Sequence, residues 1–307
     1  MAESVVVTGA PPMQSDASPS RDAAAAKPGE GRPRFAALKR AVRKPSFVVG
    51  SLLCFVALFV ALVGPFIAPN SPFDFLGVPF EPPSSALLLG ADTLGRDVLS
   101  RVLSGGWMIV LLAALSAVAG VAVGATFGIA AAYLRGAVDE VIMRSTDVLL
   151  AFPQTILALL MLSVFGPQLW LVVVIVAFLH APQVSRVARG ASLRVIEEDY
   201  VSYAETIGMH ARSVILREIL PNIRATLFVE ISLRFTYSVA IIAGLNFLGF
   251  GVQPPNADWG LMINENRIGL EINPWPVVIP VARIAMLTIG INMITDYFSL
   301  AVRRAGD

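Results

Sequence analysis

Long uncharged apolar segments alternate with shorter polar segments along this chain of 307 residues. A helix rises about 1.5 Å per residue, so roughly 20 apolar residues cross the ~30 Å hydrocarbon core of a bilayer. Segments of about that length cover residues 47–68, 107–134, 143–165, 168–184, 225–250 and 275–298. The pattern therefore predicts an all-α, polytopic membrane protein with six transmembrane helices.

Two of these segments carry features that predict how the helices pack. Residues 107–134 place Gly120, Gly124 and Gly128 at helical spacing. Small residues allow helices to approach closely in lipid, where apolar side chains supply no net drive for association. Residues 143–165 contain Pro153, which predicts a kink in the third transmembrane helix.

The charges support this arrangement and orient the chain. Apolar residues make up 56% of the sequence and charged residues 15%, against roughly 25% charged residues in soluble domains. With the N-terminus inside, 18 of the 23 Lys and Arg residues lie on the inner side and three lie in outer segments. Positive charges gather on the cytoplasmic side of membrane proteins. Both termini are therefore expected in the cytoplasm.

The N-terminal segment, residues 1–35, is predicted to be a disordered cytoplasmic tail. It is rich in Ala, Pro, Ser and Gly, a composition that does not supply a packed core. Basic residues from Arg32 to Lys44 precede the first apolar segment, and no small-residue cleavage site closes a short apolar core. That segment is therefore expected to be a retained anchor helix and not a secretory signal.

The rare residue types argue against most enzyme classes. The lysines are Lys27, Lys39 and Lys44, so the body of the chain offers no P-loop lysine and no Schiff-base lysine. Cys54 is the one cysteine and there are two histidines, which leaves no Cys/His metal cluster and no internal disulfide. We expect no catalysis, cofactor or metal in this chain.

The longest inner connection, residues 183–224, is basic and predicts two short amphipathic helices. Gly208 is expected to end the first helix, and Pro221 to stop a second helix that begins at Ala211. Such helices either lie on the membrane surface or fill a groove on another protein. The first helix has Asp199 as a candidate N-cap and an apolar face that consists of Ile196, Tyr200, Tyr203 and Ile207.

Within this connection, the run DYVSYAETIGMHARSVILREILPN resembles the cytoplasmic coupling loop of permease subunits of ATP-binding-cassette importers. That signature has a small residue four positions before a glycine and Leu-Pro at its end. Ala204, Gly208, Leu220 and Pro221 stand in those places, and Asn222 follows as in the peptide importers. The runs LGADTLGRDVLSR and FLGFGVQPPNADWG resemble the segments after the first and fifth spans of dipeptide/oligopeptide permeases of the C type.

The resemblance covers about residues 36–298 and implies the MetI-like type I importer permease fold. It implies a first transmembrane helix with an extracytoplasmic segment over residues 36–106, as in the C-type permeases. A permease domain with the coupling loop 183–224 then follows over residues 107–307. The tail before residue 36 lies outside the resemblance.

The resemblance also implies partners. Two permeases, this chain and one of the related B type, would form the pathway in the bacterial inner membrane. One or two cytoplasmic ATPase subunits would bind the ATP, and an extracytoplasmic binding protein would deliver peptides or similar small solutes. No cofactor in this chain and no nucleic acid partner are expected. The coupling residues that the resemblance implies are Tyr203, Ala204, Glu205, Gly208, Leu220, Pro221 and Asn222.

The sequence departs from the family pattern at Ser202, Tyr203, Ile242 and Asn246. These departures do not change the expected class of protein, but the resemblance alone does not identify the solute. Nickel, glutathione or an opine are alternative solutes for the same fold. An ion-coupled secondary carrier is a more distant alternative, although the sequence has no clear internal repeat. An intramembrane enzyme would have to use a few acids and two histidines, which is a poor catalytic set.

Charged and polar residues inside the spans are candidates for transport roles. Arg283 is expected either to face the translocation cavity, for which Asn246 is a second candidate, or to snorkel to the outer interface. Glu230 and Arg234 are expected to form a helix ion pair near the cytoplasmic interface, with a pore-lining position as the alternative. His180 is expected near the inner end of its span.

Two expectations concern the segments beside the spans. In the outer segment, Thr93 is a candidate cap for a helix that runs to Leu103. At the inner start of the third span, a cluster of charged residues is expected to form interfacial ion pairs with Arg135 or with the coupling loop. That cluster consists of Asp139, Glu140, Arg144 and Asp147.

Overall fold

The structure is a computed structural model that describes residues 45–306, with side chains described as far as Ser299. The predicted tail, residues 1–35, lies outside the described residues. Within 45–306 the chain forms helices, two isolated β-bridges and no β-strand. The helices are α2 (Pro45–Ile67), α3 (Val98–Ser104), α4 (Gly106–Leu134), α5 (Gly136–Leu150), α6 (Gln154–Phe165), α7 (Leu169–Ile196), α8 (Asp199–Thr206), α9 (Ala211–Val214), η1 (Ile215–Ile219), α10 (Leu220–Phe247), α11 (Trp259–Asn266), η2 (Arg267–Gly269) and α12 (Trp275–Gly306).

The number of membrane spans agrees with the sequence prediction. Among the described residues, five helical stretches are long and apolar enough to cross a membrane, and α5 with α6 makes a sixth if the two count as one span. The predicted kink at Pro153 is instead a complete break, because α5 and α6 meet at 87°. Proline lacks the N–H that would continue the helix, and Pro153 here starts α6 as its extended N-cap residue.

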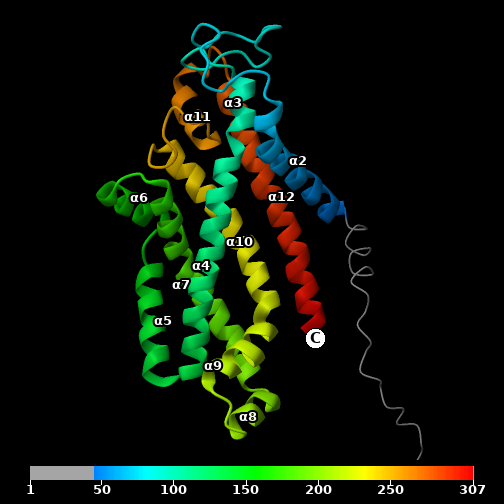
Figure 1. Ribbon diagram of the computed structural model, residues 1–307, viewed down its shortest axis with the longest axis vertical. Helices are drawn as coiled ribbons and strands as arrows, with labels where there is room; N and C mark the ends of the chain where they lie inside the picture. The colour runs from blue at the N-terminus through cyan, green and yellow to red at the C-terminus, as the bar shows by residue number, and fades with distance from the viewer. Residues whose placement is uncertain (1–44, 307) are drawn as a thin grey trace, which may run out of the picture. The chain divides into compact units, whose positions relative to one another are not determined.

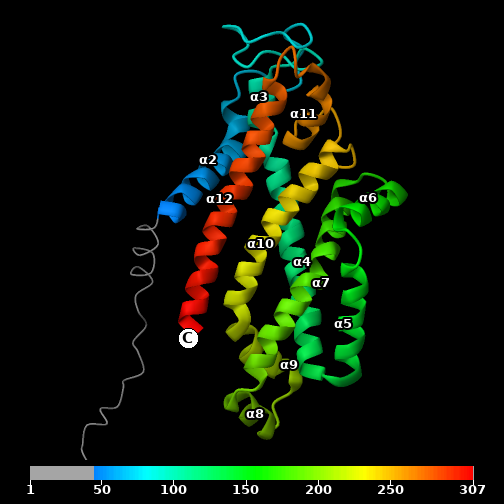
Figure 2. The ribbon, with the colours of Figure 1, turned by 180° about the vertical axis from the view of Figure 1, so that it is seen from behind.

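Within residues 45–306, the long helices run along one axis (Figures 1 and 2). The segment 68–97 lies at one end together with α11, and α8 with α9 lies at the other. We call these the α11 end and the α8 end. Helix α2 packs along α12, where Gly50 and Gly290 bring the two backbones together.

The predicted glycine stripe is the contact between α4 and α7. A Cβ atom on Gly124 would lie 2.6 Å from the carbonyl oxygen of Ala181, and one on Gly120 would lie 2.9 Å from that of Ala177. Contacts this short exclude any side chain larger than hydrogen. The stripe therefore determines how closely α4 approaches α7, as expected for small residues between membrane helices.

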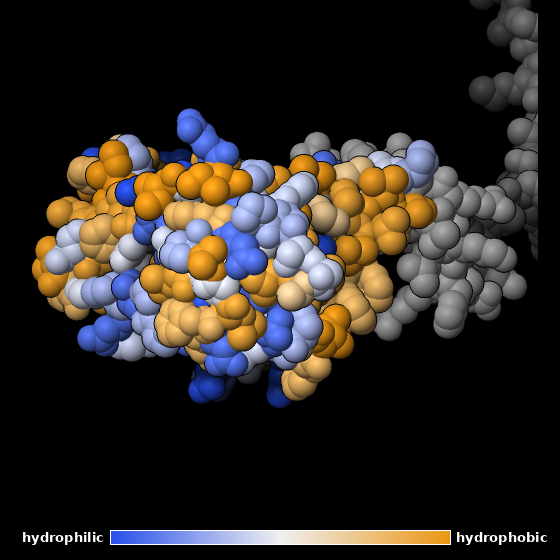
Figure 3. Space-filling view, turned by 90° about the horizontal axis from the view of Figure 1, so that it is seen from above, coloured by the Kyte–Doolittle hydropathy of each residue, from blue (hydrophilic) through white to orange (hydrophobic). Residues whose placement is uncertain are grey.

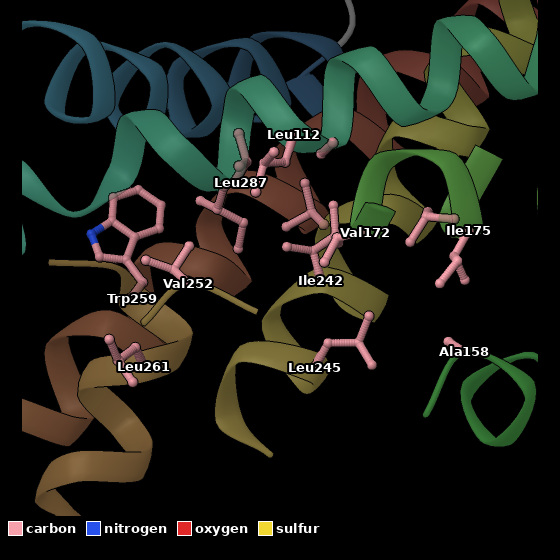
Figure 4. Close-up of a cluster of buried hydrophobic side chains, with 14 of the residues drawn as sticks. Leu112, Ala158, Val172, Ile175, Ile242, Leu245, Val252, Trp259, Leu261 and Leu287 are labelled. Atoms are coloured by element: carbon pink, nitrogen blue, oxygen red, sulfur yellow. The ribbon is translucent and has the colours of Figure 1, made fainter. Parts of the chain in front are cut away.

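The largest hydrophobic core joins these helices on the side of the α11 end. Figure 4 shows Trp259 beside Val252 and Leu261, and side chains from α4, α7, α10 and α12 packed next to them. The indole Nε1 of Trp259 donates a hydrogen bond to the carbonyl oxygen of Val102 at 2.9 Å. This bond satisfies the polar atom of a side chain that is completely buried.

Candidate functional site

The α8 end consists of residues 197–219, which connect α7 to α10. The predicted inner connection, 183–224, is longer and includes the ends of the two helices beside it. Helix α7 continues to Ile196 because no residue after Pro182 interrupts it, and α10 already begins at Leu220. The predicted N-cap at Asp199 is wrong: Asp199 is the first residue of α8, and the N-cap residue is Glu198, which makes no side-chain capping bond.

Helix α8 has one face turned into the protein and one turned outward. Val201 and Ala204 are buried in a cluster with residues of α9, η1 and the ends of α4 and α7. Tyr203 and Ile207 are 67% and 60% exposed. The predicted apolar face is therefore present in part: Tyr200, Tyr203 and Ile207 are exposed, whereas Ile196 belongs to α7 and packs against the inner cluster. The small residue Ala204 allows close packing within the chain itself.

Gly208 ends α8 in the left-handed region, with φ at +81°. The N–H of Met209 donates to the carbonyl oxygen of Ala204 at 3.1 Å, which is the six-to-one bond of a Schellman motif. A Cβ atom on Gly208 would meet no atom within 4 Å. The requirement for glycine here is therefore conformational, and the predicted helix end at Gly208 is confirmed.

Pro221 does not stop the second helix, contrary to the prediction. Helices α9, η1 and α10 run on without interruption, and Pro221 occupies the first turn of α10. The π-helical turn η1 precedes it, and proline is tolerated in a first turn because its missing N–H is not needed there. The side-chain amide of Asn222 donates to the Glu218 carbonyl at 2.6 Å and to the Tyr200 hydroxyl at 3.0 Å.

The residues of the predicted coupling loop thus divide into two groups. Ala204 is buried and Leu220 is half-buried, and both pack inside the chain. The other five are exposed: Tyr203, Glu205 and Gly208 at the α8 end, and Pro221 and Asn222 in the first turn of α10.

Ion pairs hold α5 against α7 close to the α8 end. Arg189 binds Asp139, with 2.5 Å between Nη2 and Oδ2, and Arg186 binds Asp147. The sequence predicts ion pairs between these acids and the coupling loop, and the two arginines confirm the pairing, although they lie on α7.

At the α11 end, the motif LGADTLGRDVLSR contacts α11. Four charged side chains, from residues 92–101 and from α11, form a buried cluster. The Asp92 carboxylate lies 2.7 Å from Arg96 Nε and 3.1 Å from Arg101 Nη1, and Glu265 lies 3.1 Å and 2.8 Å from the same two guanidinium groups. Burial raises the pKa of Glu265, and the positive charge of Arg96 opposes this.

The sequence contains no signal for this cluster, because Glu265 follows Arg101 by 164 residues. The predicted cap at Thr93 is also wrong. Helix α3 begins at Val98, and the Asp97 carboxylate accepts hydrogen bonds from the backbone N–H groups of Leu99 and Ser100. Figure 3 shows hydrophilic residues lying among hydrophobic ones on the end face above this cluster.

Asn246 is completely buried. Its amide donates to Asp258 at 2.6 Å and accepts from the N–H of Val252 at 3.0 Å. Asp258 in turn caps α11 by accepting from the N–H groups of Gly260 and Leu261. Burial raises the pKa of Asp258 to about 6, against the effect of these hydrogen bonds. Asn246 therefore connects α10 to α11.

The remaining intramembrane candidates differ in their surroundings. Arg283 is half-buried on α12 and forms no ion pair or hydrogen bond with the residues that the structure describes. Glu230 and Arg234 form the predicted ion pair at 3.1 Å, but both are buried. His180 is completely buried near the middle of α7 and contacts Ser238. The predicted position of His180 near the inner end of its span stays a prediction.

Residues 124–304 match the model of a family described as binding-protein-dependent transport system inner membrane component. The chain is 35% identical over 263 residues to the glutathione transport system permease protein of Pectobacterium atrosepticum, covering 86% of each chain. It is 34% identical over 263 residues to a Brucella suis protein named as a candidate peptide transport system permease, covering 84% of this chain and 87% of that one.

Proposed function

The chain belongs to the family of binding-protein-dependent transport system inner membrane components, and from this premise we propose that α8 is its contact with a cytoplasmic ATPase. The chain is the permease of such a system and spans the membrane with the helices described above. In this proposal the chain supplies the translocation pathway, and partner subunits that bind ATP supply the energy.

The exposed apolar face of α8 carries this proposal. Tyr203 and Ile207 project from a short helix whose other face is fixed by Val201 and Ala204. Gly208 then turns the chain back toward α10. A short helix held at both ends presents a rigid apolar surface, which suits insertion into a groove of another protein. Glu205 and Asn222 add polar groups beside that surface.

In this proposal the α8 end lies in the cytoplasm and the α11 end lies outside. The excess of Lys and Arg on the predicted inner segments supports that orientation, and both termini are then cytoplasmic. A second permease completes the pathway, and one or two ATPase subunits dock at α8. A solute-binding protein docks at the opposite end of the molecule.

We propose a short peptide, with glutathione as the first candidate, for the solute. The relatives named above are glutathione and peptide permeases, and they align with this chain over most of its length. Peptides carry a carboxylate at neutral pH. Arg283 has no partner among the described residues and is a candidate to meet that carboxylate.

The docking surface is tested by placing a charge on it. Tyr203→Asp puts a carboxylate where the proposal places an apolar contact, so we expect the ATPase subunits to bind at least about tenfold more weakly, a change of ~1.4 kcal/mol. Co-purification of the ATPases with the solubilised permease and uptake of glutathione into vesicles measure the effect.

Phe75→Asp is the matched control, since Phe75 is 70% exposed, close to the 67% of Tyr203, and lies at the α11 end. It is expected to leave ATPase binding unchanged. Equal binding by Tyr203→Asp and the native chain would exclude α8 as the contact. Uptake that persists without any ATPase would instead support a secondary carrier.

A further inference from the structure

A line of polar side chains joins α7 to α10 inside the helix bundle. Glu230, Arg234 and Ser238 lie four residues apart along one face of α10, and His180 and Gln183 face them from α7. We call these five residues the polar seam. His180 and Ser238 are 0% exposed, and Glu230 and Arg234 are 5% and 7% exposed.

Two contacts of the seam cross between the helices. The guanidinium of Arg234 donates from Nη1 to the side-chain oxygen of Gln183. The imidazole Nε2 of His180 lies 3.0 Å from the hydroxyl oxygen of Ser238. A third contact stays within α10, where Arg234 Nε donates to Glu230 Oε2 at 3.1 Å. Glu230 thus neutralises the positive charge of Arg234, whose guanidinium donates the hydrogen bond to Gln183 on α7.

The burial of Glu230 and Arg234 inside the helix bundle requires an explanation. Placing them within a membrane bundle costs several kcal/mol unless they are paired. Helix α7 is already held along much of its length by α4, through the glycine stripe, and it meets α10 over a shorter stretch. The crossing bonds of the seam therefore strengthen a contact of α7 that is shorter than its contact with α4.

The position of α8 between α7 and α10 in the chain indicates a role for the contact between these two helices. The segment 197–219 is attached to α7 at one end and to α10 at the other. A force on α8 therefore acts on both helices, which are held by their common neighbour α4 and by the direct contacts of the seam. We propose that the polar seam keeps α7 and α10 together as one body, so that a displacement of α8 moves both helices and opens or closes the pathway.

This inference rests on the proposed docking of an ATPase at α8. The five residues are positioning residues: they act through the two helices and do not contact the solute. The chain also holds an exposed counterpart of the buried ion pair. Glu140 and Arg144 on α5 have the same spacing and order, 2.6 Å apart, with side chains 61% and 78% exposed. An exposed pair of this kind contributes little.

The test removes the crossing contacts and leaves the ion pair intact. The double variant Gln183→Leu/Ser238→Ala lacks the Gln183 acceptor for Arg234 and the Ser238 hydroxyl beside His180, while Glu230 still accepts from Arg234. The control is Glu140→Gln/Arg144→Gln. Each is assembled with its partner permease and ATPases in proteoliposomes, in a Cys54→Ala background. Spin labels are placed at the exposed positions Val174 on α7 and Phe228 on α10.

In the native chain and the control, we expect the same distance between the labels without nucleotide and with ATP and vanadate. In the seam variant the distance should change between the two states. We also expect at least about fivefold more ATP hydrolysed per glutathione taken up, the lower end of the usual range for coupling between sites. Assembly should remain normal.

A native distance that changes with nucleotide would overturn the proposal, because α7 and α10 would then not move as one body. A seam variant with an unchanged distance would also overturn it, as would reduced assembly with an unchanged ATP-to-solute ratio, which indicates a structural role alone. Failure of the proposed function has a separate signature, since the native chain would then not bind the ATPases at all.

Discussion

Gly208 shows how one residue determines the direction of a functional element. Its φ of +81° is unfavourable for residues with a Cβ atom, at a cost of about 1–2 kcal/mol. The space around it is open, so size alone would not exclude a side chain. The left-handed turn allows the N–H of Met209 to reach Ala204, and this bond holds the end of α8 in place.

Substitutions at Gly208 should therefore rank by backbone conformation and not by size. Gly208→Asn is expected to keep ATPase binding close to native, because Asn tolerates the left-handed region. Gly208→Val, a side chain of comparable size, should weaken binding by up to about tenfold through ~1–2 kcal/mol of strain. Gly208→Pro should abolish binding, because its ring fixes a negative φ.

ATPase binding measured by titration onto the permease in nanodiscs provides the comparison. Val and Asn variants that bind equally well would show that the left-handed turn is not required.

At the scale of elements, the approach of α4 to α7 depends on glycine. Gly124→Leu would place a side chain where a Cβ already lies 2.6 Å from both the Ala181 carbonyl oxygen and the Val184 Cβ. We expect a loss of about 1–3 kcal/mol in the free energy of unfolding, the usual cost of overpacking. Thermal unfolding in detergent measures this loss as a lower Tm.

Gly190→Leu is the control on the partner helix, since a Cβ there meets no atom within 4 Å. Its Tm should stay close to native. A similar fall in Tm for both variants would indicate an effect of glycine on helix stability in general, and not of the contact between α4 and α7.

The prolines show what the sequence can and cannot predict about elements. The apolar segments predict the spans, because lipid requires about 20 apolar residues for each. Prolines lie inside α2, α7 and α12 without ending these helices, whereas Pro153 marks a break of 87°. The outcome depends on tertiary partners, such as the bond that Gln154 Nε2 donates to the Leu179 carbonyl at 2.8 Å.

The candidate site was predictable to a similar degree. Helical spacing correctly places Tyr203 and Ile207 on one apolar face and ends the helix at Gly208. Spacing does not reveal that Ala204 packs within the chain, because a small residue suits an internal contact as well as an external one. Contacts between distant segments, such as Arg101 with Glu265, leave no periodic signal in one sequence.

At the scale of the whole molecule, Arg283 is a charge without a partner among the described residues, in a chain that we propose to work beside a second permease. If it faces the pathway, Arg283→Gln should reduce uptake of glutathione at least about tenfold, because a buried charge pair with the solute carboxylate would be lost. ATP hydrolysis without solute should not change. Uptake of glutathione and of its fully amidated form into proteoliposomes makes the comparison.

The amidated solute lacks the carboxylates and should be transported equally by both proteins. Arg283→Lys keeps the charge and should retain part of the uptake. Native uptake of glutathione by Arg283→Gln would place Arg283 outside the pathway and favour the outer interface.

The buried cluster at the α11 end also has a consequence for the order of biosynthesis. Arg96 and Arg101 are separated from Glu265 by 169 and 164 residues, and Thr93 from its partner Asn266 by 173. Ribosomes add about 5–20 residues per second, so on the order of 10–30 s pass between the synthesis of the two halves. During that interval the two arginines have no acid from α11, and the end of the molecule closes only after the fifth span has been made.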